Sequence, residues 1–309
     1  MKKRKVNKGN LFSKLSAIIF VFGIVSCKDI SKDTAAIQQE DARYFAELQD
    51  WQNERFKSLK AKDGWLNLAG LYWLNEGENT IGADSTNTIQ LPAGKSDDFV
   101  GTYTVENGKI IFTVNPTSVV TQNNEAVVVV PIFPAEKAVI LEHKNIAWFV
   151  IQRGEKFAIR LRDYDSELAK NFSGVATYPF KEQWKVKAKL VPPIQKLISI
   201  TDITDRVSEQ ETAGTLHFEI GGKPHSLVAI ASGDKLFVIF GDATNSEETY
   251  DTGRFLYAQL PDADGYTWLD FNKAYNPPCA FTPYSTCPLP PPQNILTIKI
   301  TAGEKRFIS

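Results

Sequence analysis

The chain has 309 residues, which suits two modest domains or one large β domain, and 43% of them are apolar, which is enough for a core. The formal net charge of −1 is unevenly distributed, because residues 1–26 hold six basic side chains and no acidic one. Without that segment 29 basic residues face 36 acidic ones, a net charge of about −7. This balance argues against a nucleic-acid partner, since phosphate backbones are bound by clustered Lys and Arg.

The first 26 residues have the pattern of a secretory signal peptide. A basic stretch precedes the apolar run 15–25, which is too short to span a bilayer. Ile24-Val25-Ser26-Cys27 resembles the lipobox of bacterial lipoproteins, in which the peptide is cut before the cysteine and the cysteine receives acyl chains such as palmitate. We therefore expect a signal peptide over 1–26 and a membrane anchor at lipidated Cys27. Lys28 follows the cysteine and favours the outer membrane, and an ordinary cleaved signal with a free Cys27 is the alternative.

Residues 27–37 are polar and lack periodicity, which predicts a flexible tether. The segment 38–60 predicts an amphipathic helix, which Asp63-Gly64 ends. Its apolar residues recur every three or four positions: Tyr44, Phe45, Leu48, Trp51, Phe56 and Leu59. We expect this stripe to pack on the β core, and a groove for a partner is the alternative.

From Trp65 onward, short β-rich runs alternate with turn residues about every ten positions, a spacing typical of a β-sandwich. Asn107-Gly108 is the strongest hairpin turn. The segment 71–92 resembles the opening of a forkhead-associated sandwich. Ala83 stands where that family has the arginine that grips phosphothreonine, so the resemblance implies architecture and no phosphopeptide binding.

Pro192-Pro193 predicts the boundary between two halves. After it, Gly221-Gly222 and Gly233-Asp234 join three β runs into a meander. The predicted fold class is mainly β, with an N-terminal helix and two abutting sandwich or meander halves. The predicted segments are a signal peptide (1–26), a tether (27–37), a helix with the N-terminal β half (38–192) and the C-terminal β half (193–309).

Motifs for metal or cofactor chemistry are absent from the sequence. His143, His217 and His225 lack the close spacing of a zinc site, and no CxxC or HExxH occurs. No GxSxG, Walker or GxGxxG motif is present either. We therefore predict no metal and no cofactor.

Arg160 and Arg162 point the same way along a predicted strand. Two guanidinium groups on one face can hold a carboxylate bidentately. A structural ion pair with Asp163 or a neighbouring acid is the alternative.

Cys279 and Cys287 lie in a segment, 277–292, that holds seven of the sixteen prolines. Outside the cytoplasm such a pair can close a small loop and stiffen it. A cysteine nucleophile beside a histidine is the alternative, although no sequence feature places a histidine near either thiol.

Polar side chains crowd the segments 240–254 and 270–276. The set comprises Asp242, Thr244, Glu247, Thr249, Tyr250, Arg254, Asp270, Asn272, Tyr275 and Asn276. Asp242 and Asp270 each follow a predicted strand, where they would act as a general acid/base pair if one were desolvated. Turn capping or pairing with Arg254 is the alternative.

The blocks FGDATNSEETYDTGRFL, DFNKAYNPPCAF, CPLPPPQNIL and TAGEK resemble the signature of an uncharacterised bacterial family, domain of unknown function 1684. The upstream segments WLNLAGLYWL and RLRD are similar to its earlier blocks, so the resemblance covers about 51–305. It implies export or lipid anchoring but no activity. As a candidate site it implies Asp242, Thr244, Thr249, Tyr250, Gly253, Arg254, Asp270, Phe271, Asn272, Asn276, Pro277, Cys279 and Cys287.

Three functions remain open on the sequence. The first is an envelope lipoprotein whose C-terminal half binds a small polar ligand or glycan at a rim that includes Tyr250, Arg254, Asn272 and Tyr275. The second is a metal-independent hydrolase or isomerase that uses Asp242 and Asp270. The third is a scaffold for an envelope complex, which predicts a large exposed apolar patch.

Overall fold

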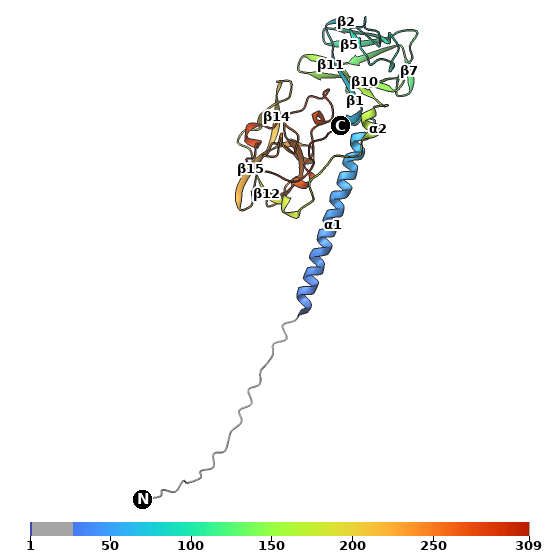
Figure 1. The fold of residues 1–309 in the computed structure, drawn as a ribbon. Helices are drawn as coiled ribbons and strands as arrows, with labels where there is room; N and C mark the ends of the chain where they lie inside the picture. Colours follow the sequence, from blue (N-terminus) through green and yellow to red (C-terminus); the bar gives the residue numbers. More distant parts are fainter. Residues whose placement is uncertain (2–26, 309) are drawn as a thin grey trace. The chain divides into compact units, whose positions relative to one another are not determined.

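The structure is a computed structural model that describes Met1 and residues 27–308 (Figure 1). The predicted signal peptide therefore lies, apart from Met1, outside the described residues. The chain divides into two units, Met1–Arg43 and Tyr44–Ser309, and the second holds all of the strands. Among the helices that the structure describes, none is long and apolar enough to cross a bilayer.

Helix α1 spans Cys27–Lys60, so the flexible tether predicted over 27–37 is wrong: that stretch is helical. The helix is free to extend there because the segment contains neither Gly nor Pro. Within the second unit, Tyr44, Leu48 and Leu59 are buried, which confirms that the aromatic stripe packs on the β core. Phe45 departs from that pattern and is 41% exposed.

The N-terminal half is a sandwich of two sheets. The first has the order β1-β11-β10-β9-β6-β7 and the second β3-β2-β4-β5-β8. Their bounds are β1 Leu68–Trp73, β2 Gly77–Gly82, β3 Ile89–Gln90, β4 Gly101–Glu106, β5 Lys109–Val114, β6 Val120–Gln122, β7 Glu125–Val127, β8 Val129–Phe133, β9 Leu141–His143, β10 Ile146–Arg153 and β11 Lys156–Asp163. One buried cluster, which includes Phe112 and Trp148, fills the space between them. The predicted sandwich and the hairpin at Asn107-Gly108 are confirmed.

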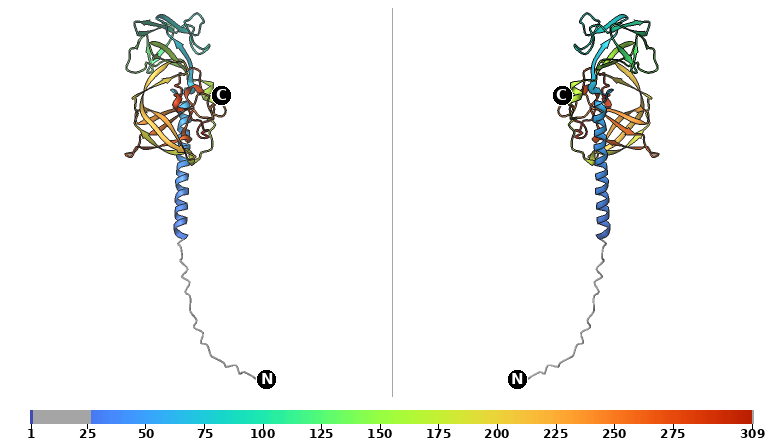
Figure 2. Two further views of the ribbon diagram at one scale, coloured as in Figure 1. Left: turned by 90° about the vertical axis from the view of Figure 1, so that its left-hand side faces the viewer. Right: turned by 90° about the vertical axis from the view of Figure 1, so that its right-hand side faces the viewer.

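The C-terminal half is a single strongly curved sheet with the order β17-β16-β15-β14-β12-β18, and β13 pairs with β14 beside it. Its strands, yellow to red in Figure 2, curve around so that β17 approaches β18. The bounds are β12 Lys185–Val191, β13 Leu197–Thr201, β14 Val207–Ile220, β15 Lys223–Ser232, β16 Lys235–Phe240, β17 Arg254–Gln259 and β18 Tyr266–Asp270. The predicted meander corresponds to β14, β15 and β16, which pair in chain order.

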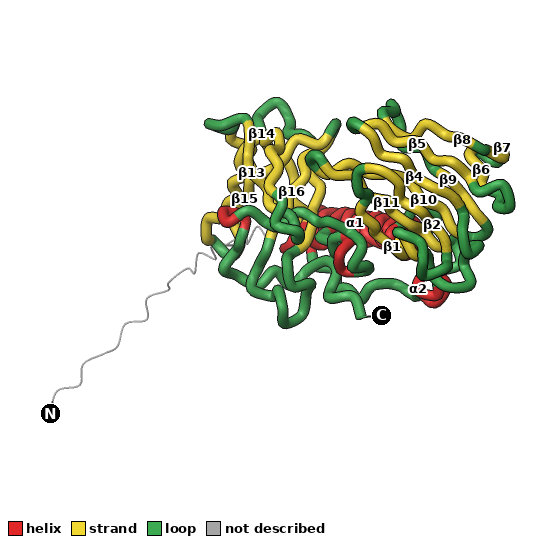
Figure 3. Tube along the Cα trace, turned by 90° about the horizontal axis from the view of Figure 1, so that it is seen from above, coloured by secondary structure: helices red, strands yellow, loops and turns green. Residues whose placement is uncertain are grey.

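The predicted boundary at residue 192 is wrong by one strand. Strand β12 ends at Val191, yet it pairs with β14 and β18 of the C-terminal sheet. Pro192-Pro193 therefore lies in a loop inside the C-terminal half. Figure 3 shows the strands in two groups, with β13, β14, β15 and β16 in one and β1 to β11 in the other.

Short helices occur mainly in the connections. They are η1 Trp65–Asn67, α2 Glu167–Asn171, η2 Glu182–Trp184, η3 Phe271–Lys273, η4 Pro278–Ala280 and η5 Pro292–Asn294. The segment 271–308 contributes no strand to any of the three sheets. It nevertheless buries Ala274, Ile300 and Ala302 against the C-terminal core. The signature residues of this segment are therefore placed by packing and hydrogen bonds rather than by a strand ladder.

Candidate functional site

Arg254 is fully buried at the first position of β17. Its Nη2 donates to Oδ2 of Asp242 at 2.7 Å and to the carbonyl oxygen of Ile300 at 2.9 Å. Its Nη1 donates to the carbonyl oxygens of Ala302 and Glu304. The guanidinium therefore joins the loop after β16 to the last residues of the chain. We call these contacts the Arg254 network.

Asp242 organises the loop on the other side of the Arg254 network. Its Oδ1 accepts from the backbone N–H of Thr244 at 2.9 Å, from the hydroxyl of Thr244 at 2.7 Å and from the N–H of Ile300 at 3.1 Å. The hydroxyls of Thr244 and Thr249 lie 2.8 Å apart, and Asn245 Nδ2 donates to Thr249 at 3.0 Å. These polar residues specify one loop conformation rather than an open binding surface.

Two glycines of the signature blocks are required by close approach of the backbone. Gly253 has a φ of 101°, and a Cβ there would lie 2.5 Å from the carbonyl oxygen of Phe240. Gly303 has a φ of 76°, and a Cβ would overlap the carbonyl group of Ala274. L-residues with a side chain rarely adopt such φ values. The positive φ and the lack of space for a Cβ therefore each favour glycine at both positions.

Asp270 ends β18 and belongs to a separate network with helix α1. Its Oδ1 accepts from the hydroxyl of Tyr44 at 3.0 Å and from the backbone N–H of Asn272 at 3.2 Å. Asn272 Nδ2 donates to Tyr44 at 2.8 Å, and its Oδ1 accepts from the N–H of Lys181 at 3.1 Å. Burial, with Asp270 as the second cause, raises the pKa of Tyr44 well above its usual value. The phenol therefore stays protonated as the donor that docks the helix.

Glu304 and Arg55 form a third network. Glu304 is 1% exposed, and its Oε1 accepts from Arg55 Nε at 3.1 Å while its Oε2 accepts from the N–H of Asn276 at 2.7 Å. Arg55 also donates to the carbonyl oxygen of Asn276 at 3.0 Å and covers the ring of Tyr275 at 4.6 Å. Burial, followed by the neighbouring Tyr257, raises the pKa of Tyr275. An arginine of helix α1 thus closes over the signature segment.

These three networks change the interpretation of the predicted site. Asp242, Thr244, Thr249, Arg254, Asp270, Asn272 and Asn276 are all buried, whereas Tyr250 and Tyr275 are half-buried. They do not form the open rim that the sequence predicted. Asp242 and Asp270 share no hydrogen-bond partner, and each caps a turn, so the structure does not support the acid/base pair. Glu247, on the same loop, is exposed and pairs with Lys299.

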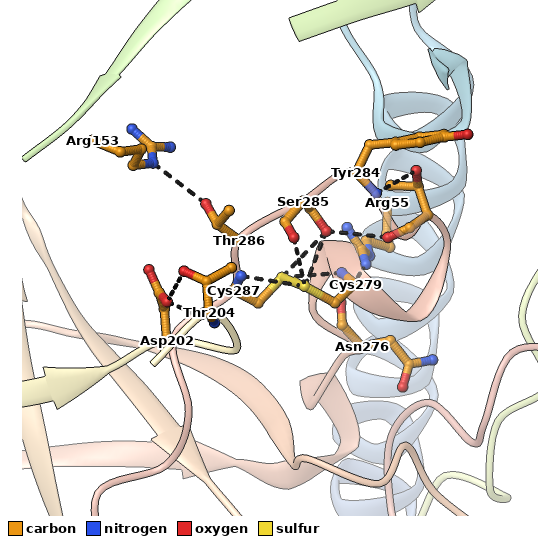
Figure 4. The surroundings of a disulfide bond; sticks show 11 residues. Arg55, Arg153, Asp202, Thr204, Asn276, Cys279, Tyr284, Ser285, Thr286 and Cys287 are labelled. Atoms are coloured by element: carbon orange, nitrogen blue, oxygen red, sulfur yellow. Dashed lines mark hydrogen bonds between the residues drawn. A yellow bond between two sulfur atoms is a disulfide. The ribbon is translucent and has the colours of Figure 1, made fainter. Parts of the chain in front are cut away.

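Cys279 and Cys287 are joined in a disulfide, with Cα atoms 6.1 Å apart (Figure 4). The closed segment, 279–287, is called the disulfide loop below. The hydroxyl of Thr282 donates to the carbonyl oxygen of Leu68 in β1 at 3.1 Å, and Thr286 accepts from Arg153 Nε at 3.3 Å. The N–H of Ile203 donates to the carbonyl oxygen of Cys287 at 3.0 Å. The disulfide loop therefore contacts both β halves.

A partly enclosed cavity of about 180 Å³ opens beside the disulfide loop. Its apolar lining consists of Ile200 in β13, Ile230 in β15, Phe237 and Ile239 in β16, and Pro288 directly after the disulfide loop. Its polar lining consists of Asp202, Arg206, Ser208, Gln210 and Thr286. Apolar walls with a few convergent polar groups are typical of small-ligand sites.

The charges in this cavity are balanced. Burial alone would raise the pKa of Asp202, but hydrogen bonds from Thr204 and Arg206 lower it below its usual value. Arg206 Nε lies 3.2 Å from Asp202 Oδ2, and its side chain is 39% exposed. The carboxylate is therefore ionised and holds Arg206 in place, and the rest of that guanidinium is accessible to a ligand.

The histidines are separated. His143 is buried, with Nδ1 2.8 Å from the carbonyl oxygen of Val119. His217 and His225 lie on neighbouring strands but pair with Ser226 and Phe218 respectively, not with each other. Over residues 27–308, no group of three or more His, Cys, Asp or Glu side chains is arranged to hold a metal.

Comparison with known proteins gives a match to one family model and several similar solved structures. A family model described as "Protein of unknown function (DUF1684)" matches residues 170–305, which excludes the upstream segments of the predicted resemblance. The solution NMR structure of an uncharacterized protein from gene locus rrnAC0354 of Haloarcula marismortui is 32% identical, covers 45% of this chain and 80% of that chain, and has a TM-score of 0.38. No curated protein matches the chain.

Two structures of forkhead-associated domains are also similar. One is the FhaA domain complexed with the intracellular domain of Rv3910, and the other comes from work on phosphothreonine-dependent interactions of such domains. Both are 17% identical with a TM-score of 0.22, and cover 30% of this chain and 97% and 92% of their own. A likeness at this level carries no conclusion about what the chain binds.

Proposed function

Residues 170–305 place this chain in the DUF1684 family, and from that premise we propose that the protein is a cell-envelope lipoprotein that binds a small polar ligand or glycan unit in its C-terminal half. The observation that carries the proposal is the cavity beside the disulfide loop. It differs from the predicted site, because the signature residues are buried in the three networks described above. Ligand contacts come instead from Arg206, Ser208, Gln210 and Thr286.

The size and lining of the cavity limit the ligand. At about 180 Å³ it is smaller than the roughly 300–1,000 Å³ of sites for drug-sized molecules, so it fits a small metabolite or a single sugar unit. The isoleucines and Phe237 remove apolar ligand surface from water, and Ser208 and Gln210 offer both donors and acceptors. A polar molecule with one apolar face matches this lining.

Ligand binding is tested by a thermal-shift screen of small polar molecules and monosaccharides against the wild type and Ser208→Phe. Ser208 lines the cavity, so the phenyl ring fills the space, and we expect the ligand-induced shift to disappear. Ser199→Phe is the matched control, because Ser199 is exposed on the neighbouring strand and does not line the cavity. A ligand that shifts Ser208→Phe as much as the wild type, or a screen without any hit, would contradict the proposal.

The lipid anchor is supported by the sequence around Cys27 and by the disulfide, because disulfides persist mainly in oxidising compartments. In a bacterial host, we expect the wild type to incorporate radiolabelled palmitate and to fractionate with the outer membrane. Cys27→Ser should lose both properties while retaining the Cys279–Cys287 bond. Palmitate incorporation that survives Cys27→Ser would refute the anchor.

The other two predicted functions have less support. The enzyme hypothesis depended on a shared pocket for Asp242 and Asp270, and neither residue lines the cavity. The scaffold hypothesis stays a prediction. Exposed apolar side chains do occur at Val191, Ile194 and Leu197, around the Pro192-Pro193 loop, but nothing on that surface indicates a partner.

A further inference from the structure

Arg160 lies on β11, the second strand of the first sheet, between the edge strand β1 and β10. Its neighbours in the chain, Ile159 and Leu161, point into the sandwich core. The side chain of Arg160 therefore leaves the opposite face of the sheet. Phe149 is its partner in β10, and Arg153, four residues further along that strand, lies on the same face.

The disulfide loop contacts the sheet at two points, one on each side of Arg160 along β11. One of its contacts, from Thr282 to Leu68, lies at the end of β11 that carries Arg162, because Leu68 pairs with Arg162. The other contact, between Thr286 and Arg153, lies at the β10–β11 turn, where Arg153 pairs with Lys156. Arg160 lies between these two points along β11, and it is only 7% exposed. Figure 4 shows Arg153 reaching the loop at Thr286.

The burial of Arg160 is not compensated by an acid among the residues that the structure describes. Its Nε is buried without a hydrogen-bond partner. Its guanidinium carbon lies 5.6 Å from the centre of the Trp65 ring. Burial, followed by the charges of Arg153 and Arg162, lowers its pKa to about 10. Burial and then the charge of Arg206 likewise lower the pKa of Arg153, and the charge of Asp202 opposes this shift without reversing it. The positive charges of Arg160, Arg153 and Arg162 therefore lie close enough to repel one another.

A buried charge is costly unless it is paired, and buried arginines are normally paired with carboxylate or phosphate groups. We propose that Arg160 and Arg153 form an anion-binding site beneath the disulfide loop, for a ligand that carries a carboxylate, phosphate or sulfate group. Two guanidinium forks on one sheet face match the oxygen pairs of such groups. Thr286 adds a hydroxyl at the open side, where Arg153 is only half-buried.

This site goes beyond the cavity function and does not depend on it. Arg160 and Arg153 do not line the cavity, although Thr286 borders both. A small anion can occupy the arginine site while the cavity holds another molecule.

The test measures binding of inorganic phosphate, sulfate and acetate to the whole exported chain by calorimetry and thermal shift, at constant ionic strength set with chloride. We expect saturable binding of at least one of these anions and an increase in Tm. Arg160→Met should weaken that binding about ten- to hundredfold, as expected for the loss of a charge-assisted hydrogen bond. Arg153→Met should weaken it as well. The preferred anion identifies the acidic group of the natural ligand.

Two controls make the outcome decisive. Arg306→Met removes a partly exposed arginine that pairs with Asp251 and should leave anion binding unchanged. Ser208→Phe fills the cavity and should also leave it unchanged, so failure of the cavity function and failure of the arginine site are distinguishable. The proposal is overturned if none of the three anions binds saturably or if Arg160→Met binds as well as the wild type. It is also overturned if anion-free Arg160→Met has a much lower Tm than the wild type, because Arg160 would then be a structural residue.

Discussion

Arg254→Met is expected to destabilise the protein by about 3–5 kcal/mol, the range for breaking a buried ion pair from one side. The substitution leaves the carboxylate of Asp242 buried without its cation, and it removes donors from the carbonyl oxygens of Ile300, Ala302 and Glu304. A loss of this size approaches the whole stability of many domains. We therefore expect a greatly reduced yield of folded protein, or a large fall in the urea midpoint of unfolding.

The matched control for Arg254 is Arg306→Met. Arg306 also pairs with an aspartate, Asp251, but the two side chains are 38% and 56% exposed, so the expected change is at most about 1 kcal/mol. The double variant Arg254→Met/Asp242→Asn removes the stranded charge and should be more stable than Arg254→Met alone. Equal effects of Arg254→Met and Arg306→Met on the urea midpoint would show that the Arg254 network does not stabilise the fold more than an exposed ion pair does.

Arg55→Met is expected to lower the free energy of unfolding by about 3 kcal/mol, because it leaves the buried carboxylate of Glu304 without its cation. Glu304 is 1% exposed, and without Arg55 Nε its carboxylate retains only the N–H of Asn276. The variant also loses the cation–π contact with Tyr275, worth on the order of 1 kcal/mol. The helix residues that pack through Leu48 and Leu59 should then become more accessible to hydrogen exchange.

The same helix supplies the control for Arg55. Lys57 pairs with Glu54, and both side chains are more than two-thirds exposed, at 77% and 73%. Lys57→Met should therefore change the free energy of unfolding by no more than about 0.5 kcal/mol. Glu304→Gln in the Arg55→Met background should restore part of the stability by removing the buried negative charge. If Arg55→Met and Lys57→Met unfold at the same denaturant concentration, the Arg55–Glu304 pair contributes nothing.

The elements that local pattern determines could be predicted from the sequence. Asn107-Gly108 sets its hairpin by turn chemistry alone. Burial alternates along β5 although residues 110–112 are all apolar, so Ile111 lies on the exposed face. The boundary at Pro192-Pro193 could not be predicted, because proline signals a loop but not which sheet the preceding strand joins. Strand β12 has alternating lysines, a pattern equally suited to either half.

Most of the residues of the buried polar networks were predictable as a set, but the cavity was not, because none of its lining residues belongs to the predicted site. The crowding of polar residues over 240–254 correctly marked residues that interact, but sequence cannot tell whether such a group faces water or a buried partner. The partners come from distant segments: Asp242 contacts Ile300, and Asp270 contacts Tyr44. Arg55 and Glu304 were missed because each looks like an ordinary charged residue until the fold brings them together. Arg160 and Arg162 were predicted to hold a carboxylate or to form an ion pair, but the burial of Arg160 with an unpartnered Nε could not be foreseen.

The docking of α1 sets the order in which this chain can reach its native state. Tyr44 meets a partner 226 positions later, and Arg55 meets one 249 positions later. Such distant contacts form slowly, since a long loop must be closed before they stabilise anything. During synthesis, the polar contacts of Tyr44 and Arg55 cannot form until Asp270 and Glu304 have been made. These two contacts therefore close the fold rather than start it, and the helix is fully fastened only when the segment that carries Glu304 packs against it.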